Sequence, residues 1–337
     1  MKVDYYYPPL PPGSAAEAAH RAARIGYDGF FTTETSHEPF LPLALAAQAE
    51  PDLTLGTAIA VAFPRSPMVT AQLAWDLASL SQGRFVLGLG TQVRAHVTRR
   101  FSTEWTAPGP RLREYVQALR AIWRSFQHSE RLRFEGEHYR FSLLTPFFDP
   151  GPISHPEIPV AIAGVGPYLS GLAGELCDGF HVHPFHSVRY LDSVVLPEMR
   201  AGAERAGRTL EDVERISTVF VVTGRDEAET NQVREMVRQQ IAFYASTPSY
   251  RPVLDAHGWD FGDELTRLSK RGDWAAMASL VDDDVVDEVA VSAPPDRLGE
   301  AIKERYGDRI QRVGFYAVGG DGMFTEAEWA EIVAGAR

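Results

Sequence analysis

The chain has 337 residues, of which 45% are hydrophobic and 23% are charged, and its formal net charge is −12. An acidic surface repels phosphate backbones, so this balance argues against nucleic acid as a partner. Cys177 is the only cysteine, which excludes an intrachain disulfide and a metal site built from cysteines.

Short apolar runs alternate with longer amphipathic segments along the whole chain. This alternation predicts strands that are buried on both faces, each followed by a helix. The predicted strands are Val3–Tyr6, Gly29–Thr33, Leu53–Phe63, Arg84–Gly90, Ile158–Ala163, Gly179–His183, Ile216–Thr223 and Val313–Val318.

The segments between these runs carry helical spacing. Ser14 stands three residues before Glu17, which is the spacing of a capping box, so we expect Ser14 to cap a helix that runs to Ile25. Further helices are predicted at Leu41–Ala49, Pro67–Leu80, Leu112–Phe126, Tyr168–Cys177, Val188–Ala206, Glu227–Ala245 and Glu326–Ala334.

Two segments interrupt the alternation. Arg131–Leu144 alternates around a central Glu-Gly, which predicts a small hairpin inserted after the fourth helix. Ser246–Arg309 contains helical pieces but no convincing strand, and we expect a helical extension between strands seven and eight. Eight strands separated by helices favour an α/β fold, a (β/α)8 TIM barrel that forms one domain over residues 1–337. An open doubly wound sheet stays as the alternative, because strand order cannot be derived from sequence.

The start of the chain lacks the basic and apolar regions of a signal peptide. The apolar run Leu53–Phe63 is shorter than the about 20 residues that a membrane span needs. We therefore expect a cytoplasmic protein with a small-molecule substrate and no membrane partner.

In a TIM barrel, functional residues follow the carboxyl ends of the strands. Polar groups and glycines at these predicted positions are Tyr7, Thr33, Glu34, His37, Thr91, Gln92, Arg94, Gly164, Gly166, His181, His183 and His186. Glu34 is either a ligand-binding or acid–base carboxylate, or a solvated loop residue.

Gly164 and Gly166 follow a predicted strand and open a helix. Small residues there let backbone N–H groups approach an anion, and the helix amino terminus adds about half a unit of positive charge. A purely structural tight turn is the alternative.

His181 and His183 alternate on one strand, with His186 close behind. Such a pair suggests a metal, but a catalytic metal site usually needs a third protein ligand and oriented outer partners. We expect no metal and place His183 in the pocket, because it lies nearer the strand end. A metal-dependent barrel hydrolase or lyase remains an alternative.

Three blocks of sequence carry a family resemblance: Leu55-Gly56-Thr57-Ala58-Ile59, Arg65-Ser66-Pro67, and Ser81 to Gly90 with the pattern S-x-G-R-F-x-L-G-x-G. Together they resemble the luciferase-like monooxygenase superfamily, and within it most closely the coenzyme F420-dependent oxidoreductases of actinobacteria. The resemblance extends over nearly the whole chain.

That resemblance implies a barrel that binds FMN or the deazaflavin F420 across its mouth. It further implies a non-proline cis peptide within Thr57–Ile59 beside the ring, and the cofactor phosphate at Gly164–Gly166. The residues expected to contact the cofactor are Thr33, Glu34, Thr57, Ala58, Ile59, Thr91, Gln92, Ala163, Gly164, Val165, Gly166 and His183.

The chain departs from the sugar-phosphate dehydrogenases of this family, because Thr35 and Val93 replace their His and Glu. We therefore expect hydride transfer between F420 and another small organic substrate, namely an alcohol, carbonyl, imine or enone. The residues expected to face this substrate as catalytic groups are Tyr7, Glu34, His37 and His183.

An FMN-dependent monooxygenase that uses reduced flavin and O2 is the alternative that keeps the same fold. Either enzyme implies a separate reductase that supplies the reduced cofactor, and the family resemblance adds a homodimer. The acidic tail of the deazaflavin predicts basic contacts, for which Arg189, Arg251, Lys270 and Arg297 are candidates or else surface cations.

Overall fold

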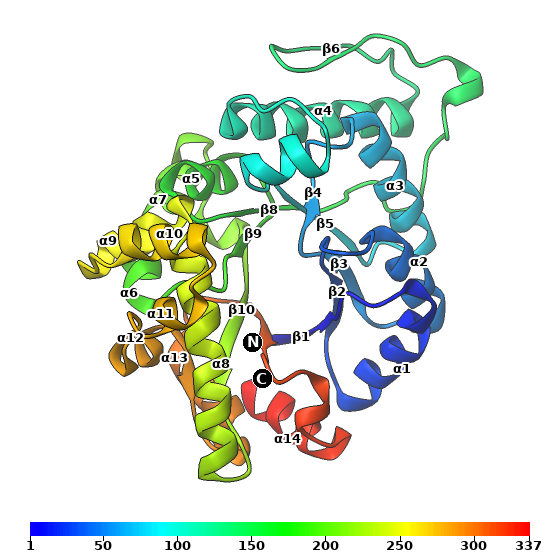
Figure 1. Ribbon diagram of the computed structural model, residues 1–337. Coiled ribbons are helices and arrows are strands. Elements are labelled where there is room, and N and C mark those ends of the chain that lie inside the picture. Colours follow the sequence, from blue (N-terminus) through cyan, green and yellow to red (C-terminus); the bar gives the residue numbers. More distant parts are fainter.

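Eight parallel strands close into a barrel surrounded by helices in the computed structural model, which describes residues 1–337 except the side chain of Asp321 (Figure 1). The barrel strands are β1 (Lys2–Tyr7), β2 (Gly29–Thr32), β3 (Thr54–Thr57), β5 (Phe85–Gly90), β8 (Val160–Gly164), β9 (Gly179–Val182), β10 (Glu214–Val222) and β12 (Arg312–Tyr316). The ring is complete because β12 pairs with both β10 and β1, with Arg312 opposite Lys2. The predicted TIM barrel is confirmed, and the open sheet is wrong.

The predicted third strand is broken into two pieces. β3 ends at Thr57, β4 (Ala60–Val61) resumes and pairs with β5, and the bulge between them contains a cis peptide bond between Ala58 and Ile59. The cis bond lies in the segment where the family resemblance implied it.

Eight barrel helices and helical segments follow the strands in order. They are α1 (Ala15–Ile25), α2 (Phe40–Ala49), α3 (Pro67–Leu80), α4 (Pro108–His128), α5 (Pro167–Leu176), α6 (Val188–Tyr190) with α7 (Leu196–Arg205), α8 (Glu227–Ala245) and α14 (Glu326–Ala336). Helix α1 begins where it was predicted, but the Ser14 side chain does not cap it. The Ser14 hydroxyl instead lies 2.6 Å from the Tyr7 hydroxyl.

The predicted extension is helical. It comprises α9 (Arg251–His257), α10 (Gly262–Arg271), α11 (Trp274–Ala278), α12 (Asp283–Val289) and α13 (Pro295–Tyr306). One correction is needed, because Val291–Ser292 forms the short strand β11, which pairs with β10. Helix α13 then packs against α14 and completes the outer ring of helices.

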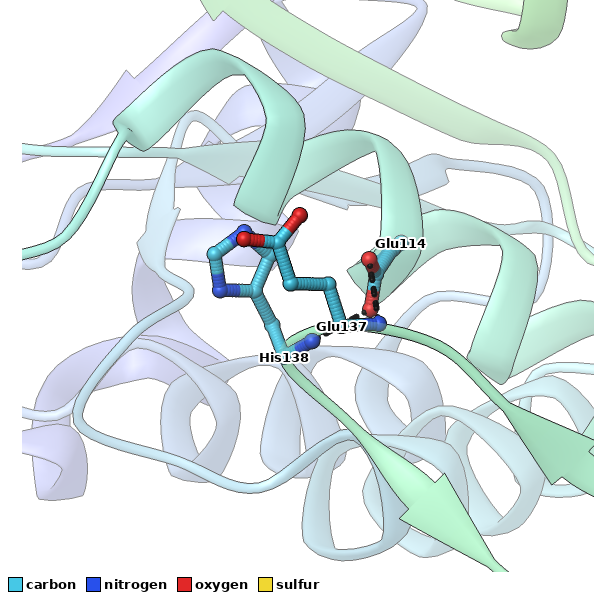
Figure 2. A group of neighbouring side chains, drawn as sticks. All are labelled: Glu114, Glu137 and His138. Atoms are coloured by element: carbon cyan, nitrogen blue, oxygen red, sulfur yellow. Dashed lines mark hydrogen bonds between the residues drawn. The ribbon is translucent and has the colours of Figure 1, made fainter.

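The predicted hairpin is present after α4, with β6 (Phe134–Glu135) antiparallel to β7 (Arg140–Phe141). Figure 2 shows how it is attached: the Glu114 carboxylate on α4 accepts hydrogen bonds from the backbone N–H groups of Glu137 and His138, at 2.9 and 2.8 Å. Partial burial opposes ionisation of Glu114, but these backbone hydrogen bonds outweigh it and lower its pKa. The carboxylate therefore fixes the inserted hairpin to the barrel.

Strand alternation decides which side chains enter the barrel. Tyr5 contacts Tyr27 on the outer face, whereas Asp4 bonds to Arg312 in the interior. Tyr6 and Phe31 stack in the next interior layer with their ring centroids 5.7 Å apart. Further along each strand, the residues that point inward in the same alternation line the mouth of the barrel, at the carboxyl ends of the strands.

No helix in the described part of the chain is both long enough and apolar enough to cross a lipid bilayer.

Candidate active site

The bulge after β3 is fixed from both neighbouring strands. The Thr57 hydroxyl donates to the Gly88 carbonyl oxygen at 2.7 Å and accepts from the Gly88 N–H at 2.9 Å. On the other side, the Ala58 N–H donates to the Thr32 carbonyl oxygen at 2.7 Å. A Cβ atom at position 88 would lie 1.8 Å from the Thr57 carbonyl oxygen, so this close approach requires glycine. These contacts hold the backbone of the expected cofactor residues Thr57–Ile59 in place at the mouth of the barrel.

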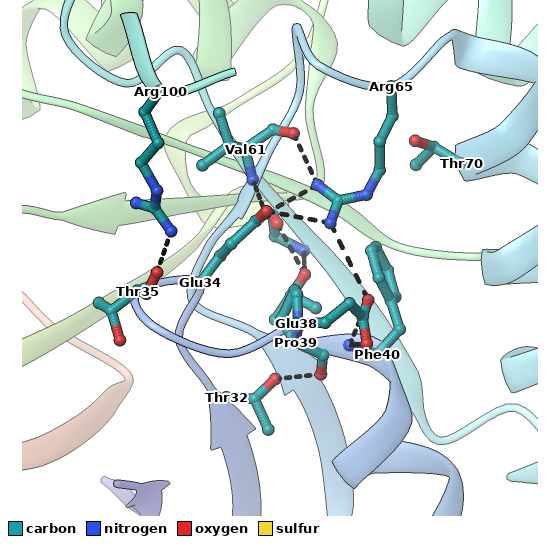
Figure 3. Close-up of polar contacts among 12 residues, drawn as sticks. Thr32, Glu34, Thr35, Glu38, Pro39, Phe40, Val61, Arg65, Thr70 and Arg100 are labelled. Atoms are coloured by element: carbon teal, nitrogen blue, oxygen red, sulfur yellow. Dashed lines mark hydrogen bonds and ion pairs between the residues drawn. The ribbon is translucent and has the colours of Figure 1, made fainter. Parts of the chain in front are cut away.

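The Glu34 carboxylate holds the bulge in position through hydrogen bonds. That carboxylate accepts from the Val61 N–H at 2.6 Å and from both terminal nitrogens of Arg65, at 2.8 and 3.0 Å (Figure 3). The Glu34 side chain is 5% exposed and that of Arg65 is 17% exposed, so Glu34 is not a solvated loop carboxylate. The Arg65 guanidinium forms a bidentate pair with this carboxyl group and holds it in position. Glu34 is therefore a positioning residue in this geometry.

The loops after β2 and β5 meet beside this anchor. The Arg100 guanidinium, from the π-helical turn His96–Arg100, donates to the Thr35 carbonyl oxygen (Figure 3). Gln92 adopts a positive φ of 58°, and its side-chain oxygen accepts from the Val93 N–H at 2.9 Å. Four expected site residues lie partly exposed in these two loops: Thr33, His37, Thr91 and Gln92.

The Gly164–Gly166 turn joins β8 to α5 and is partly exposed, as is Ala163 before it. Tyr190 contacts this turn, since the Tyr190 hydroxyl donates to the Val165 carbonyl oxygen at 2.5 Å. A Cβ atom at Gly164 would lie 2.5 Å from the Leu169 Cβ, whereas one at Gly166 would meet nothing within 4 Å. The first N–H groups of a helix have no partner within it. The turn therefore offers backbone donors beside open space, which fits a phosphate.

His183 lies at the end of β9 with its ring half-buried. Its Nδ1 accepts a hydrogen bond from the Phe185 N–H at 3.1 Å, so the ring proton is on Nε2. Burial lowers the pKa of His183 to about 3, which keeps the imidazole neutral at neutral pH. The structure thus places a neutral N–H donor at the mouth.

The three histidines of this segment do not converge. His181 is buried one layer deeper in the barrel and contacts the Phe31 ring edge-on. His186 turns away and packs against Tyr306, with its Nδ1 2.8 Å from the His183 carbonyl oxygen. Within the described residues, the group whose atoms are spaced for a metal is Glu114, Glu137 and His138 on the hairpin (Figure 2).

Tyr7 lies on the outer face of the barrel, away from the other expected site residues. Its ring contacts Phe30, and its hydroxyl donates to the Pro11 carbonyl oxygen at 2.8 Å. Only 3% of Tyr7 is exposed. The residue that enters the interior at this level is Tyr6.

Apart from His183, the sequence did not indicate an aromatic group that gathers at the ends of β9, β10 and β12 with residues of α8 and of the extension. The His183 ring stacks on Tyr250 with centroids 4.4 Å apart and meets Tyr244 edge-on at 4.6 Å. The Tyr244 and Tyr316 hydroxyls lie 2.9 Å apart, and Tyr316 packs on the fully buried Phe220. We call His183, Phe220, Tyr244, Tyr250 and Tyr316 the aromatic wall. Tyr244 ends a long helix and Tyr250 stands in the extension, so no periodic pattern marks either.

The basic residues considered for a cofactor tail differ in their surroundings. Arg251 pairs with Asp263 at 2.8 Å, and Arg297 pairs with Glu300 at 3.0 Å. Arg189 is exposed beside Tyr190, the residue that supports the phosphate-type turn. Lys270 is exposed as well.

Similarity to known proteins extends over nearly the whole chain. The model of the luciferase-like monooxygenase family matches residues 2–312. An uncharacterised protein of Mycobacterium tuberculosis is 47% identical over 300 residues, covering 89% of this chain and 88% of the relative. The F420-dependent glucose-6-phosphate dehydrogenase of Intrasporangium calvum is 27% identical over 334 residues, covering 94% and 92%.

The fold is shared with solved structures at lower identity. The coenzyme F420-dependent tetrahydromethanopterin reductase of Methanopyrus kandleri superimposes with a TM-score of 0.76 at 20% identity, covering 99% of this chain and 96% of that one. This likeness shows the shared fold, whereas the family model over residues 2–312 and the relative at 47% identity show the family. The chain belongs to the luciferase-like monooxygenase family and is a flavin- or deazaflavin-dependent enzyme.

Proposed function

We propose that the protein transfers a hydride between the deazaflavin F420 and a small organic substrate at the barrel mouth. The observation that carries this proposal is the bulge after β3, which the Thr57–Gly88 hydrogen bonds hold at the barrel mouth, in a chain of this family. Named relatives favour the deazaflavin, because both the dehydrogenase and the reductase described above are F420-dependent.

The residues at the mouth fit such a cofactor. Gly164–Gly166 presents backbone donors and open space for the phosphate, and the helix dipole of α5 adds favourable charge. Thr57, Ala58 and Ile59 would support one face of the ring, and Thr33, Thr91 and Gln92 would border it. A bound deazaflavin supplies a two-electron carrier whose reactive position is a carbon.

The chain's own contribution is position and exclusion of water. The Glu34–Arg65 pair holds the bulge through the Val61 N–H. His183 presents its Nε2 proton as a neutral donor, and His37 is partly exposed in the loop after β2. Orienting two reactants in this way provides a large share of catalysis.

Cofactor titration tests the proposal. Purified protein is titrated with oxidised F420 and, separately, with FMN, and binding is followed by cofactor fluorescence. We expect a dissociation constant at least tenfold lower for F420 than for FMN. Tight FMN binding without F420 binding would overturn the proposal.

A second candidate is an FMN-dependent monooxygenase that uses reduced flavin and O2, because the matched family is one of luciferase-like monooxygenases. In that case the same bulge supports the FMN ring, and the protein consumes oxygen when reduced FMN is added. We expect no such oxygen consumption above the rate of free reduced FMN. A protein-dependent burst would favour the monooxygenase.

We propose two further partners for the reaction. A separate reductase supplies the reduced cofactor, and a second copy of this chain covers the exposed apolar arm that follows the hairpin. On that arm Leu143 is 76% exposed and Phe147 is 89% exposed, which is unusual for residues of this size.

A further inference from the structure

We propose that Glu114, Glu137 and His138 bind a divalent transition metal, Zn²⁺, which cross-links the inserted hairpin to helix α4. Each side chain offers one ligand atom, and these atoms all lie within 4.8 Å of one another (Figure 2). The three residues belong to α4 and the hairpin rather than to the barrel strands or the loops of the candidate active site. This inference therefore goes beyond the proposed function and does not depend on which cofactor binds.

The backbone of the hairpin holds the Glu114 carboxylate in place. The N–H groups of Glu137, His138 and Tyr139 donate to it at 2.9, 2.8 and 3.3 Å. A Cβ atom at Gly136 would lie 2.2 Å from Glu114 Oε2, so the absence of a side chain there lets the carboxylate approach the hairpin. A carboxylate offers about four acceptor positions, so these three hydrogen bonds leave one for a metal.

The other two ligands are not engaged elsewhere. Among the described residues, neither the Glu137 carboxylate nor the His138 ring forms a hydrogen bond or an ion pair. Tetrahedral bonds of 2.0–2.1 Å to Zn²⁺ would place the ligand atoms about 3.4 Å apart. Glu137 is exposed and His138 is partly exposed, so rotation of these side chains can bring their ligand atoms to that spacing. Water completes the four-coordinate site.

The types of ligand indicate which kind of metal fits. Two carboxylates and an imidazole suit Zn²⁺, whereas Ca²⁺ and Mg²⁺ prefer oxygen ligands alone. No Lys or Arg of the described chain forms an ion pair with Glu114 or Glu137, since the neighbouring Arg140 pairs with Glu135 at 2.9 Å. A divalent ion would therefore neutralise the two carboxylates, and the imidazole distinguishes this group from an ordinary cluster of surface acids.

Such an ion would join two segments that are distant in sequence. Glu137 stands 23 positions after Glu114, at the connection between β6 and β7. A ligand that binds only the closed arrangement stabilises that arrangement over the open one. We therefore expect bound Zn²⁺ to hold the hairpin against α4 more firmly than the backbone hydrogen bonds do alone.

Calorimetric titration with Zn²⁺ tests the site. Purified protein is treated with EDTA, dialysed and titrated with zinc chloride. We expect one Zn²⁺ per chain, and Glu137→Gln and His138→Gln should each weaken its binding about 30-fold or more, because each removes one of three protein ligands. Both substitutions leave the backbone donors to Glu114 in place, so the hairpin keeps its attachment to α4.

Two variants serve as controls. Glu135→Gln removes a carboxylate from the same hairpin, and His20→Gln removes a histidine whose Nδ1 lies 2.5 Å from Glu50 on the surface. Both should bind Zn²⁺ as the wild type does. No Zn²⁺ binding by the wild type, unchanged binding by His138→Gln, or loss of binding in His20→Gln would overturn the proposal.

Trypsin digestion measures the cross-link itself. Trypsin cleaves after arginine, and the exposed residues Arg133 and Arg140 lie on either side of the hairpin ligands. Cleavage of a paired segment requires local opening, so Zn²⁺ should slow cleavage at these sites about fivefold in the wild type and leave it unchanged in His138→Gln. Equal rates with and without Zn²⁺ in the wild type would refute the cross-link. Failure of F420 to bind would refute the proposed function without affecting either zinc measurement.

Discussion

At the scale of single residues, the Glu34–Arg65 pair holds the bulge at the barrel mouth in position. We expect Glu34→Gln to lower the free energy of unfolding by about 3 kcal/mol, because it leaves a largely buried guanidinium without its counter-charge. The Val61 anchor also weakens, so F420 affinity should fall about tenfold. Urea unfolding and cofactor titration measure the two effects.

Glu38→Gln is the control for that substitution. Glu38 is also near Arg65, at 4.0 Å, but its side chain is 39% exposed, and an exposed pair contributes little. Its amide oxygen still accepts from the Phe40 N–H at the start of α2. Equal losses of stability in the two variants would show that the buried pair does not fix the bulge.

Some hydrogen-bond partners could not be predicted from the sequence, because the paired residues lie far apart in the chain or because another residue competes for the same side chain. Glu34 and Arg65 stand 31 positions apart, so no spacing rule links them, although Arg65 falls in one of the family blocks. Ser14 has the right spacing for a cap, yet the Tyr7 hydroxyl competes successfully for its side chain. Local patterns predict backbone geometry better than they predict hydrogen-bond partners.

At the scale of elements, the barrel strands were predictable because they are buried on both faces and are therefore rich in apolar and β-branched residues. The same property hid the break at Ala58–Ile59, since the apolar and β-branched run Leu53–Phe63 is nearly uninterrupted, and only the family resemblance indicated the bulge. The two-residue strand β11 is too short to give any pattern. The aromatic wall combines residues at or near the ends of three strands with α8 and the extension, an arrangement that depends on tertiary packing.

The turn between β8 and α5 gives the prediction that belongs to this scale. Gly166→Glu should weaken binding of both F420 and FMN at least 30-fold, because the new carboxylate repels the cofactor phosphate and the acidic tail. Titration of the purified variant with each cofactor measures this loss.

Gly166→Ala isolates the effect of charge from that of size. A Cβ atom at this position meets nothing within 4 Å, so the alanine variant should keep wild-type affinity and stability. If Gly166→Glu also bound both cofactors normally, the phosphate would have to lie elsewhere.

At the scale of the whole molecule, buried histidines make stability depend on pH. Burial lowers the pKa of His181 and His183 to about 3 and that of His186 to about 4, below the value near 6.5 of the unfolded chain. Below pH 6.5 the unfolded state therefore binds more protons, and the free energy of unfolding falls as the pH falls. Each histidine contributes up to about 1.4 kcal/mol per pH unit in this window.

Urea unfolding between pH 7.5 and 5 measures this dependence. His181→Gln should reduce the slope by the contribution of one histidine, whereas His128→Gln, at an exposed helix end, should leave it unchanged. A slope that is the same in both variants would mean that His181 carries a proton in the folded state.

The apolar arm after the hairpin exposes large apolar side chains, which a monomeric barrel would leave in contact with water. Phe147 and Phe148 are 89% and 64% exposed, and together with Trp75 on α3 they line a cavity of about 370 Å³. Figure 1 shows this segment extending from the hairpin around the outside of α4 and α3. Side chains of this size exposed together favour burial against another protein surface, which in the proposed homodimer is a second copy.

Serine substitution of both phenylalanines tests that surface. We expect Phe147→Ser/Phe148→Ser to shift the wild-type dimer to a monomer in analytical ultracentrifugation, with unchanged F420 affinity because the mouth lies on another face of the barrel. The exposed Trp274 of α11, at 55% exposure, gives the control variant Trp274→Ser, which should stay dimeric. A wild-type protein that is monomeric at micromolar concentration would refute the homodimer. A double variant that remains dimeric would instead move the interface to another surface of the barrel.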